Sequence, residues 1–464
     1  MSIRTGVVGS ESVTRRSFLG SCLRAGISFG IASGLPYMSP IEVFAGFEAP
    51  QEATGLQLPH TVIKEKGKKI RPVILLWLDG GASRYEMHDP KFHLPGHANY
   101  APEEIRGDFK PIQTSVPGVF VSELMPLHAQ RMHKLALINT ITHKNTNHED
   151  ATNICFTGNH EFLGSRTPLY RSPSAEMSEQ HLVGKIPNVV FQTHKTFQVA
   201  SPIEPNSGLF IRTNSDDSYT SPAGGDFEIQ LHGRKLGIFR TLEQLGKQIE
   251  GRQANQYRRF FDTANLLLDK GLHVAFDLSQ ESDETRERYG RTAMGNAMLA
   301  SRRLVELLLR LADEFQFDER FVITVNCDYW DDHDDISMYM NKRVPIFDQA
   351  STALIDDVED IAYVVEFGEF GRTPKIIKKN KNNNNGRDHW PDSNFMVVAG
   401  PGIKGGTVLG STDNQGKVNS GVPLHASLAA DSILGLGGWV RVWTDSGKQF
   451  HRWQDEAYFN QIFG

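Results

Sequence analysis

The chain has 464 residues, of which 39% are hydrophobic and 22% are charged. This length provides for one large α/β domain or two smaller ones with ample core, and the composition is that of a globular protein. The formal net charge of −6 argues against nucleic acid as the main partner, and 3 cysteines exclude a disulfide framework. Cys155 and Cys327 adjoin apolar runs, so we expect them to be buried free thiols.

Residues 1–45 resemble a twin-arginine signal peptide. Arg15 and Arg16 stand in Thr-Arg-Arg-Ser-Phe-Leu-Gly, and a weakly apolar run rich in glycine, alanine and serine follows. Val43-Phe-Ala45 is a suitable cleavage site. The apolar run is far shorter than the ~20 residues of a membrane-spanning helix, so we expect no stable membrane span. The alternative is an accidental arginine pair in a terminal tail. The signal predicts the twin-arginine translocase as a partner and a periplasmic or extracellular location.

Residues 46–70 read as a linker, and residues 71–464 as a single α/β domain. The apolar run Val73–Leu78 ends in Asp79-Gly80-Gly81. Such a run is typical of a buried parallel strand whose carboxyl end opens into a loop. Similar runs occur at Leu135–Ile138, Phe321–Val325, Ile361–Val365 and Phe395–Ala399.

Apolar residues recur at helical spacing between these runs, at residues 252–269 and 284–313. Leu304, Leu307, Leu308 and Leu311 form one stripe, which predicts a helix packed on a sheet. The alternation of strands and helices predicts an open, mainly parallel sheet sandwiched by helices. In such sheets, ligands bind at the carboxyl ends of the strands.

Acidic residues and histidines gather where the predicted strands stop. Carboxylates and neutral imidazoles from several loops are the ligands of a divalent cation such as zinc, manganese, calcium or iron. Two ions about 4 Å apart clamp the attacking and leaving oxygens of a phosphoryl-type transfer. Taken singly, each residue has a structural alternative, such as a turn, a core histidine or a solvated charge. The candidates are Asp79, Asn147 to Asp150, Asp331, His333, Glu369, Asp388 and His389.

Seven motifs in order along residues 70–410 resemble the domain-of-unknown-function 1501 family (DUF1501). That family resembles alkaline phosphatases, sulfatases and cofactor-independent phosphoglycerate mutases in fold. The resemblance therefore implies an alkaline-phosphatase-like core. The motifs are Leu78–Ser83, Ile105–Ile112, Thr142–Asn145, Arg286–Gly290, Trp330–His333, Gly368–Pro374 and Gly386–Pro391.

The resemblance also implies roles for single residues. Asp79 matches the aspartate that ligates the metal beside the nucleophile. Asp331 and His333 resemble the Asp and His pair of the other metal. Glu369 and Phe370 stand where the superfamily usually has Asp-His, so that Glu369 retains a ligand group and Phe370 does not. The late histidine that completes the metal site is matched by His389, and Asp388 beside it is a further candidate ligand.

The nucleophile is the main departure from the superfamily pattern. There, the nucleophile begins a helical segment that ends in Thr-Gly, here Thr157-Gly158, and the usual spacing leads back to His148. His148 is either the nucleophile or a third ligand beside which water attacks directly, and an imidazole next to a cation is normally a ligand. Arg372 is predicted to neutralise a bound oxyanion, with a structural salt bridge as the alternative.

These observations predict an exported, metal-dependent hydrolase, with water activated by one or two metal ions. Its substrate would be an anionic small-molecule or polysaccharide ester of phosphate or sulfate. One alternative is a non-catalytic metal- or ligand-binding scaffold on the same fold, which the missing nucleophile favours and the retained ligands oppose. The other is a mutase or isomerase. This alternative needs an obvious nucleophile, which the sequence lacks.

The leader generates the first prediction. Replacing the pair, Arg15→Lys with Arg16→Lys, should keep the protein in the cytoplasm, because the translocase recognises the arginine pair itself. Cell fractionation measures the distribution, and Arg4→Lys outside the pair serves as the matched control. Normal export of the double variant would contradict the twin-arginine interpretation.

Overall fold

The computed structural model of the chain describes the core region and part of the C-terminal region. The described residues are 60–64, 71–97, 99–158, 188–192, 208–213, 227–228, 272–315, 321–327, 330–378, 385–420, 424–428, 432–433, 436, 439–445, 448–450 and 459–462. The predicted leader and the predicted helix at 252–269 lie outside them.

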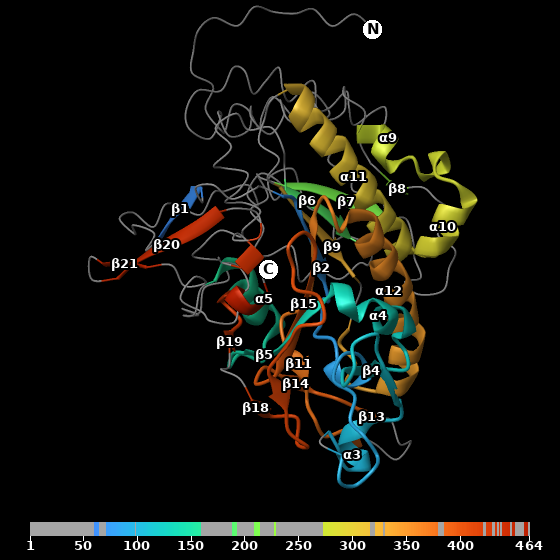
Figure 1. Cartoon of the computed structure of the whole chain (residues 1–464), viewed down its shortest axis with the longest axis vertical. Coiled ribbons are helices and arrows are strands. Elements are labelled where there is room, and N and C mark those ends of the chain that lie inside the picture. The colour runs from blue at the N-terminus through green and yellow to red at the C-terminus, as the bar shows by residue number, and fades with distance from the viewer. Residues whose placement is uncertain are drawn as a thin grey trace, which may run out of the picture.

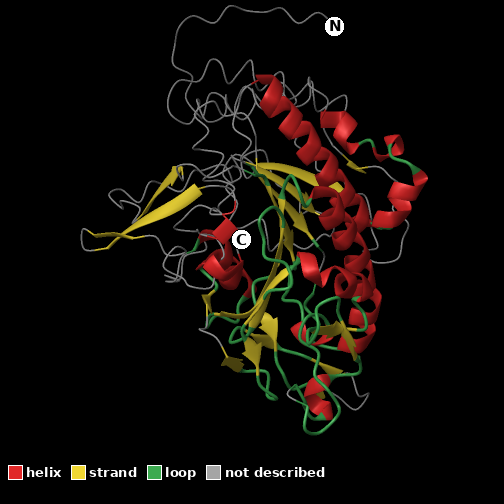
Figure 2. Cartoon of the chain, in the orientation of Figure 1, coloured by secondary structure: helices red, strands yellow, loops and turns green. Residues whose placement is uncertain are grey.

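A central sheet of ten strands organises the described residues (Figure 1, Figure 2). The order is β16-β5-β15-β10-β2-β9-β6-β7-β8, and β19 pairs with β5 outside this path. Most neighbouring pairs are parallel. The strands are β2 (Val73–Trp77), β5 (Ala136–Thr142), β6 (Asn188–Gln192), β7 (Gly208–Thr213), β8 (Phe227–Glu228), β9 (Val322–Asn326), β10 (Tyr363–Phe367), β15 (Asn394–Ala399), β16 (Val408–Leu409) and β19 (Leu424–His425).

The continuous apolar runs form the central strands because both faces of the sheet are covered. In β2, Ile74 and Leu76 belong to one hydrophobic core, and Val73, Leu75 and Trp77 belong to the other. A strand that is buried on both faces has no solvent side, so its sequence does not alternate between apolar and polar residues. This confirms the predicted mainly parallel sheet between helices.

The helices form the outer layers. Figure 1 shows α11 and α12 on one side of the sheet and α5 on the other, and these helices contribute to the two separate cores. The predicted leucine stripe of α11 is buried, as expected. The described helices are α3 (Glu103–Arg106), α4 (Pro126–Arg131), α5 (His148–Thr157), α9 (Leu272–Phe276), α10 (Asp283–Tyr289), α11 (Ala293–Phe315), α12 (Ile336–Val358) and α15 (Phe459–Ile462), with 3-10 turns at Arg84–Glu86, Met132–Lys134 and Leu278–Gln280.

Two sequence predictions need correction. The helical stretch at 284–313 is two helices, α10 and α11, because Gly290 ends α10 with a φ of 76°. The run Phe395–Ala399 is a buried strand, but β15 is antiparallel to both β10 and β5. Among the described residues between β10 and β15, 368–378 and 385–393, there is no helix. A parallel β15 would need a crossover, usually a helix, to carry the chain back to the other edge of the sheet.

Smaller strand pairs surround the sheet. Part of the predicted linker forms β1 (His60–Lys64), which pairs with β20 (Trp439–Asp445), itself paired with β21 (Lys448–Phe450). None of the described helices has the length and apolar character needed to cross a membrane. The other pairs are β3 (Pro111–Gln113) with β4 (Phe120–Ser122), β11 (Gly371–Arg372) with β14 (His389–Trp390), β12 (Ile377–Lys378) with β13 (Asn385–Gly386), and β17 (Ser411–Thr412) with β18 (Val418–Ser420).

A buried ion-pair network ties β10 to α4 and α12. His128 on α4 lies between two carboxylates, with its Nδ1 2.6 Å from Asp348 Oδ1 and its Nε2 2.9 Å from Glu366 Oε1. Burial alone would lower the pKa of His128, but the two carboxylates outweigh it and raise the pKa to about 10. His88 lies beside the same glutamate, with its Nε2 3.5 Å from Glu366 Oε2.

This network generates a stability prediction. His128→Gln removes the buried positive charge, and breaking such a pair costs about 3 to 5 kcal/mol of unfolding free energy. Because the folded pKa of His128 is raised, its contribution is complete below its unfolded pKa and is lost as the pH rises toward about 10.

Urea unfolding of the wild type and the variant between pH 6 and pH 10 measures this effect. The difference between the two proteins should shrink as the pH rises. A difference that stays constant over this range would contradict a protonated His128.

Candidate functional site

The candidate site lies where four parallel strands of the sheet lead into polar loops. β5, β10, β2 and β9 point the same way, so their carboxyl ends meet at one edge. Asp79 follows β2, Asp331 follows β9, Glu369 follows β10, and His148 begins α5 after β5. His389 joins them through β14, which pairs with β11 in the loop after β10.

The Asp331 carboxylate is the centre of the contacts. Its Oδ1 lies 2.6 Å from Arg372 Nη2, 2.9 Å from His389 Nε2 and 2.8 Å from His333 Nε2. Its Oδ2 lies 3.4 Å from His148 Nε2. Burial by itself would raise the pKa of Asp331, but these donors and the arginine charge hold it well below its usual range. Asp331 is therefore a carboxylate at neutral pH.

His148 connects the two sides of the site. Its Nδ1 lies 2.8 Å from Glu369 Oε1, while its Nε2 faces Asp331. Burial alone would lower the pKa of His148, but hydrogen bonds to these two carboxylates raise it to about 9. The side chain of Asn147 accepts a hydrogen bond from the Asp150 backbone N–H, which caps α5 and starts the helix at His148.

Asp79 and Glu369 form a buried acidic pair. Asp79 is 1% exposed and Glu369 is 0% exposed. Glu369 Oε1 accepts from the Gly80 backbone N–H at 2.8 Å, whereas Asp79 Oδ1 and Glu369 Oε2 have no hydrogen-bond partner among the described residues. Burial, followed by the neighbouring Glu369 charge, raises the pKa of Asp79 well above its usual range. Two buried carboxylates with unsatisfied oxygens are the environment that a bound cation stabilises.

His333 and Asp388 lie at the outer side of the site. His333 Nδ1 is 2.7 Å from Asp388 Oδ1, and their side chains are 34% and 40% exposed. His333 Nε2 also lies 3.0 Å from His389 Nε2. Asp388 thus contacts His333. Orienting an imidazole is a common role for such a carboxylate.

Three residues have ligand atoms that all lie within 4.8 Å of one another, and they could hold a metal ion: His148, Asp331 and His389. Imidazole nitrogens and a carboxylate oxygen suit zinc, manganese or iron. The Phe370 ring lies beside two of them, with its centroid 5.1 Å from that of His148 and 4.4 Å from that of His389. Phe370 therefore fills space next to the histidines without offering a ligand.

Two glycines allow the loops to approach this closely. A Cβ at Gly80, whose φ is +105°, would lie 2.7 Å from the Asp331 backbone nitrogen. A Cβ at Gly386 would lie 1.7 Å from the His333 carbonyl oxygen. Either clash would separate segments that carry proposed ligands.

The structure brings the predicted ligands Asp79, His148, Asp331, His333, Glu369 and His389 to this one edge. It also includes residues that the sequence analysis did not select. Asn326 ends β9 and donates from Nδ2 to Asp79 Oδ2 at 3.4 Å. His143 donates from Nε2 to the Glu369 carbonyl at 2.7 Å, and burial lowers its pKa to about 4. The position of both residues at the end of a buried strand was the available signal.

The two described thiols are free and buried, as predicted. Cys155 donates from Sγ to the Glu369 carbonyl at 3.5 Å, and burial raises its pKa well above the usual range. A neutral buried thiol is a poor nucleophile. Cys155 therefore packs behind the site.

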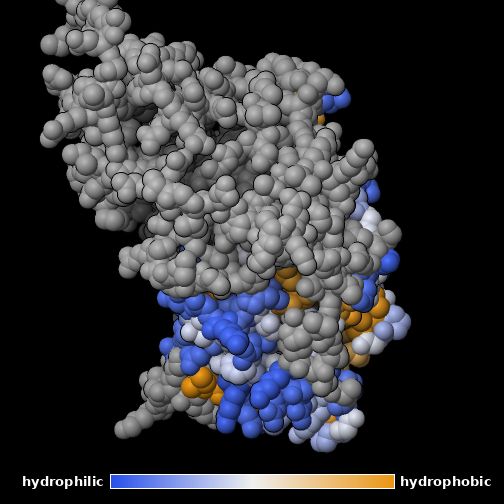
Figure 3. All heavy atoms as spheres, turned by 90° about the vertical axis from the view of Figure 1, so that its left-hand side faces the viewer, coloured by the Kyte–Doolittle hydropathy of each residue, from blue (hydrophilic) through white to orange (hydrophobic). Residues whose placement is uncertain are grey.

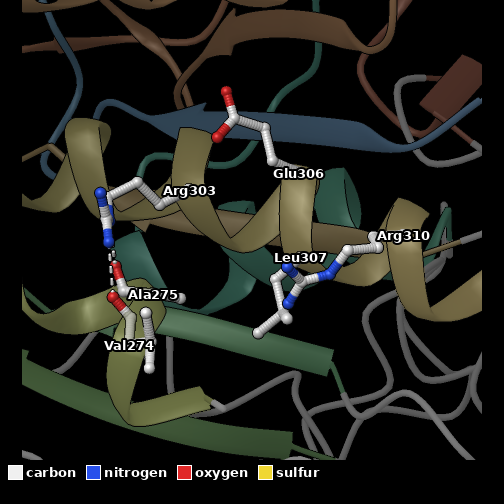
Figure 4. Close-up of a pocket in the computed structure, with 6 residues that line it drawn as sticks. All are labelled: Val274, Ala275, Arg303, Glu306, Leu307 and Arg310. Carbon is white, nitrogen blue, oxygen red and sulfur yellow. Dashed lines mark hydrogen bonds between the residues drawn. The ribbon is translucent and has the colours of Figure 1, made fainter. Parts of the chain in front are cut away.

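A separate hollow lies between α9 and α11 (Figure 4). Arg303 donates there to the Val274 and Ala275 carbonyls and pairs with Glu281, and Glu306 pairs with Arg302. None of the predicted site residues lines it. The residues that line the hollow are Val274, Ala275, Arg303, Glu306, Leu307 and Arg310.

On the face shown in Figure 3, the described surface is mainly hydrophilic, with small apolar areas.

Several solved structures match the chain at low identity. Alkaline phosphatase from the Antarctic bacterium TAB5 is 14% identical, with 80% of this chain and 99% of that chain covered and a TM-score of 0.35. The zinc complex of the C-terminal periplasmic domain of EcEptC from Escherichia coli is 9% identical, with coverages of 87% and 98% and a TM-score of 0.34.

An alkaline phosphatase superfamily protein from Vibrio parahaemolyticus is 11% identical, with coverages of 85% and 73% and a TM-score of 0.37. At these values the likenesses carry no argument about activity. No curated protein matches the chain. The family model described as "Protein of unknown function (DUF1501)" matches residues 70–437. The chain therefore belongs to the DUF1501 family, as its motifs predicted.

Proposed function

We propose that this protein is an exported metal-dependent hydrolase of phosphate or sulfate esters with an alkaline-phosphatase-like core. The observation that carries the proposal is the group of His148, Asp331 and His389 beside the buried pair of Asp79 and Glu369. Five ligand-type side chains from separate loops meet at the edge of the sheet where α/β proteins bind ligands.

The side chains fit divalent cations on two grounds. In the described part of the chain, Asp79 Oδ1 and Glu369 Oε2 are buried without a hydrogen-bond partner, and bound cations would satisfy such oxygens. The histidine-rich group suits zinc, manganese or iron, whereas the carboxylate pair suits harder cations such as calcium or manganese. His148 touches both groups.

The charge of the site favours two cations. Asp79, Asp331, Glu369 and Asp388 contribute four carboxylates, and Arg372 contributes one positive charge. Metal ligation requires neutral imidazoles and ionised carboxylates. In that state, negative charges exceed positive charges by three. One divalent cation would leave the site negative, and two would make it positive. An anionic ester is attracted only in the second case.

When bound, the cations would supply an activated water molecule and a Lewis acid for the developing oxyanion. The chain's own residues position the ligand groups. Glu369 and Asp331 face opposite ring nitrogens of His148 and so fix the plane of its imidazole. Asp388 orients His333 in the same way from the exposed side. Both histidines are thus held in place before a cation or a substrate binds.

One observation favours the second candidate, a non-catalytic metal- or ligand-binding scaffold. Phe370 occupies space beside His148 and His389 where a further ligand would strengthen the site. Binding without turnover requires the metal ligands alone. Measurement of turnover separates the two functions.

The proposed function predicts metal-dependent ester hydrolysis. The purified protein should contain zinc, manganese, iron or calcium by elemental analysis, and it should hydrolyse phosphate or sulfate monoesters in a substrate panel. A chelator should abolish this activity, and re-addition of the metal should restore it. Asp331→Asn, which removes the central charge without changing size, should lose metal and activity together. Bound metal without hydrolysis of any ester would support the scaffold instead.

His148 generates a separate prediction, because it is proposed as a ligand. His148→Ala should lower the metal content and abolish hydrolysis together, since it removes a contact with both acidic groups. His148→Ser restores the residue type usual in the superfamily and should permit turnover with weaker metal retention. Elemental analysis and kinetic assays measure both effects.

A catalytic nucleophile at this position would behave differently. His148→Ala would then keep its metal, and the wild type incubated with a phosphate ester would show a phosphohistidine by mass spectrometry. Full metal content with unchanged activity in His148→Ala would contradict both roles.

A further inference from the structure

The sequence left two roles open for Arg372, neutralising a bound oxyanion or forming a structural salt bridge, and its side chain is 0% exposed. Its Nη2 donates to Asp331 Oδ1 at 2.6 Å and to the Trp330 carbonyl at 3.2 Å. The same nitrogen contacts the Gly80 carbonyl. The part of the guanidinium group nearest the proposed ligands is therefore occupied by protein acceptors.

The remaining donors reach two further carbonyls. Arg372 Nε donates to the Gly81 oxygen at 2.8 Å, and Nη1 donates to the Arg387 oxygen at 3.0 Å. These acceptors lie in three segments. The first follows Asp79, the second contains Asp331, and the third immediately precedes Asp388. One planar side chain thus joins the three segments that carry most of the proposed ligands.

We infer that Arg372 is a positioning residue that sets the affinity of the site for divalent cations and does not contact the substrate. This inference rests on the proposed metal site. The exposed members of the site, His333 and Asp388, mark the side from which an ester approaches, and Arg372 has no exposed surface there. Its rigid fork of donors matches several carbonyl oxygens at once, which a lysine ammonium cannot do.

The charge and the geometry of Arg372 act in opposite directions on a cation. The positive charge next to Asp331 weakens cation binding, whereas the hydrogen bonds hold the ligand segments together and strengthen it. Arg372→Lys keeps the charge and removes the fork of donors. This variant therefore isolates the geometric contribution, and Arg372→Met shows the combined effect.

Zinc titration of the metal-free protein by calorimetry tests the inference. Arg372→Lys should raise the Kd for zinc by roughly 10- to 100-fold, the range typical for partners that orient metal ligands. At saturating zinc, KM for p-nitrophenyl phosphate should change by less than about threefold, because uniform substrate binding is unaffected. An unchanged zinc Kd, or a KM raised about tenfold or more at saturating zinc, would overturn the inference.

Arg343→Lys is the matched control. Arg343 is also buried, and its Nη1 lies 2.7 Å from Asp332 Oδ2, one residue along from Asp331. Arg343→Lys keeps the charge and removes a comparable arginine fork on an aspartate in the same loop, so the zinc Kd should stay at the wild-type value. An equal rise in both variants would show a general loosening of the loop and would also overturn the specific role of Arg372.

A second measurement does not depend on the variants folding. A crystal structure of the wild type with zinc and inorganic phosphate should show no hydrogen bond between Arg372 and the phosphate, and such a bond would refute the inference. Zinc binding without hydrolysis of any ester would defeat the proposed function but leave the Arg372 titration valid. A wild type that binds no divalent cation would defeat both.

Discussion

The confinement of like charges at one edge of the sheet is the constraint on which the rest of the site depends. Asp79, Glu369 and Asp331 come from three adjacent strands, and burial brings their carboxylates together away from water. Such a group is unfavourable unless cations or hydrogen-bond donors compensate it. The surrounding side chains provide that compensation unequally.

Asp331 is well supplied with donors, because Arg372 and three histidines surround it. The Asp79–Glu369 pair is not, since each residue keeps an oxygen that has no hydrogen-bond partner in the part of the chain that the structure describes. The difference divides the site into a part that is stable as it stands and a part that a cation would complete. The unsatisfied pair is thus a second physical argument for metal binding, beside the group of His148, Asp331 and His389.

The frame around the proposed ligands is buried and joined by hydrogen bonds. The sheet is covered on both faces, and the buried His128 network joins β10, which leads into Glu369, to the helices on one side. Arg372 and two glycines then set the distance between loops. Packing fixes the strands, while hydrogen bonds to backbone carbonyls fix the loops. Both would be required to hold the proposed ligands within reach of the cations.

The sequence by itself determined the fold class and the residue types of the site. Continuous apolar runs ending in Asp79-Gly80 or near Glu369 identify buried strands, since only strands covered on both faces lack alternation. The family and the residue types of the site can both be identified from motifs, because each motif is a short continuous segment of the chain. The sequence could not determine the direction of β15, because an apolar run is the same in either direction.

That direction decides where His389 lies. In an all-parallel sheet, a residue just before a strand lies at the amino edge, away from Asp79 and Asp331. Because β15 runs antiparallel, its beginning lies at the carboxyl edge, and His389 reaches Asp331 Oδ1 at 2.9 Å. The burial of Arg372 and the contact of Asp388 with His333 were likewise decided by tertiary structure. Hydrogen-bond partners that lie far apart in sequence depend on how the loops pack, and no local pattern records that packing.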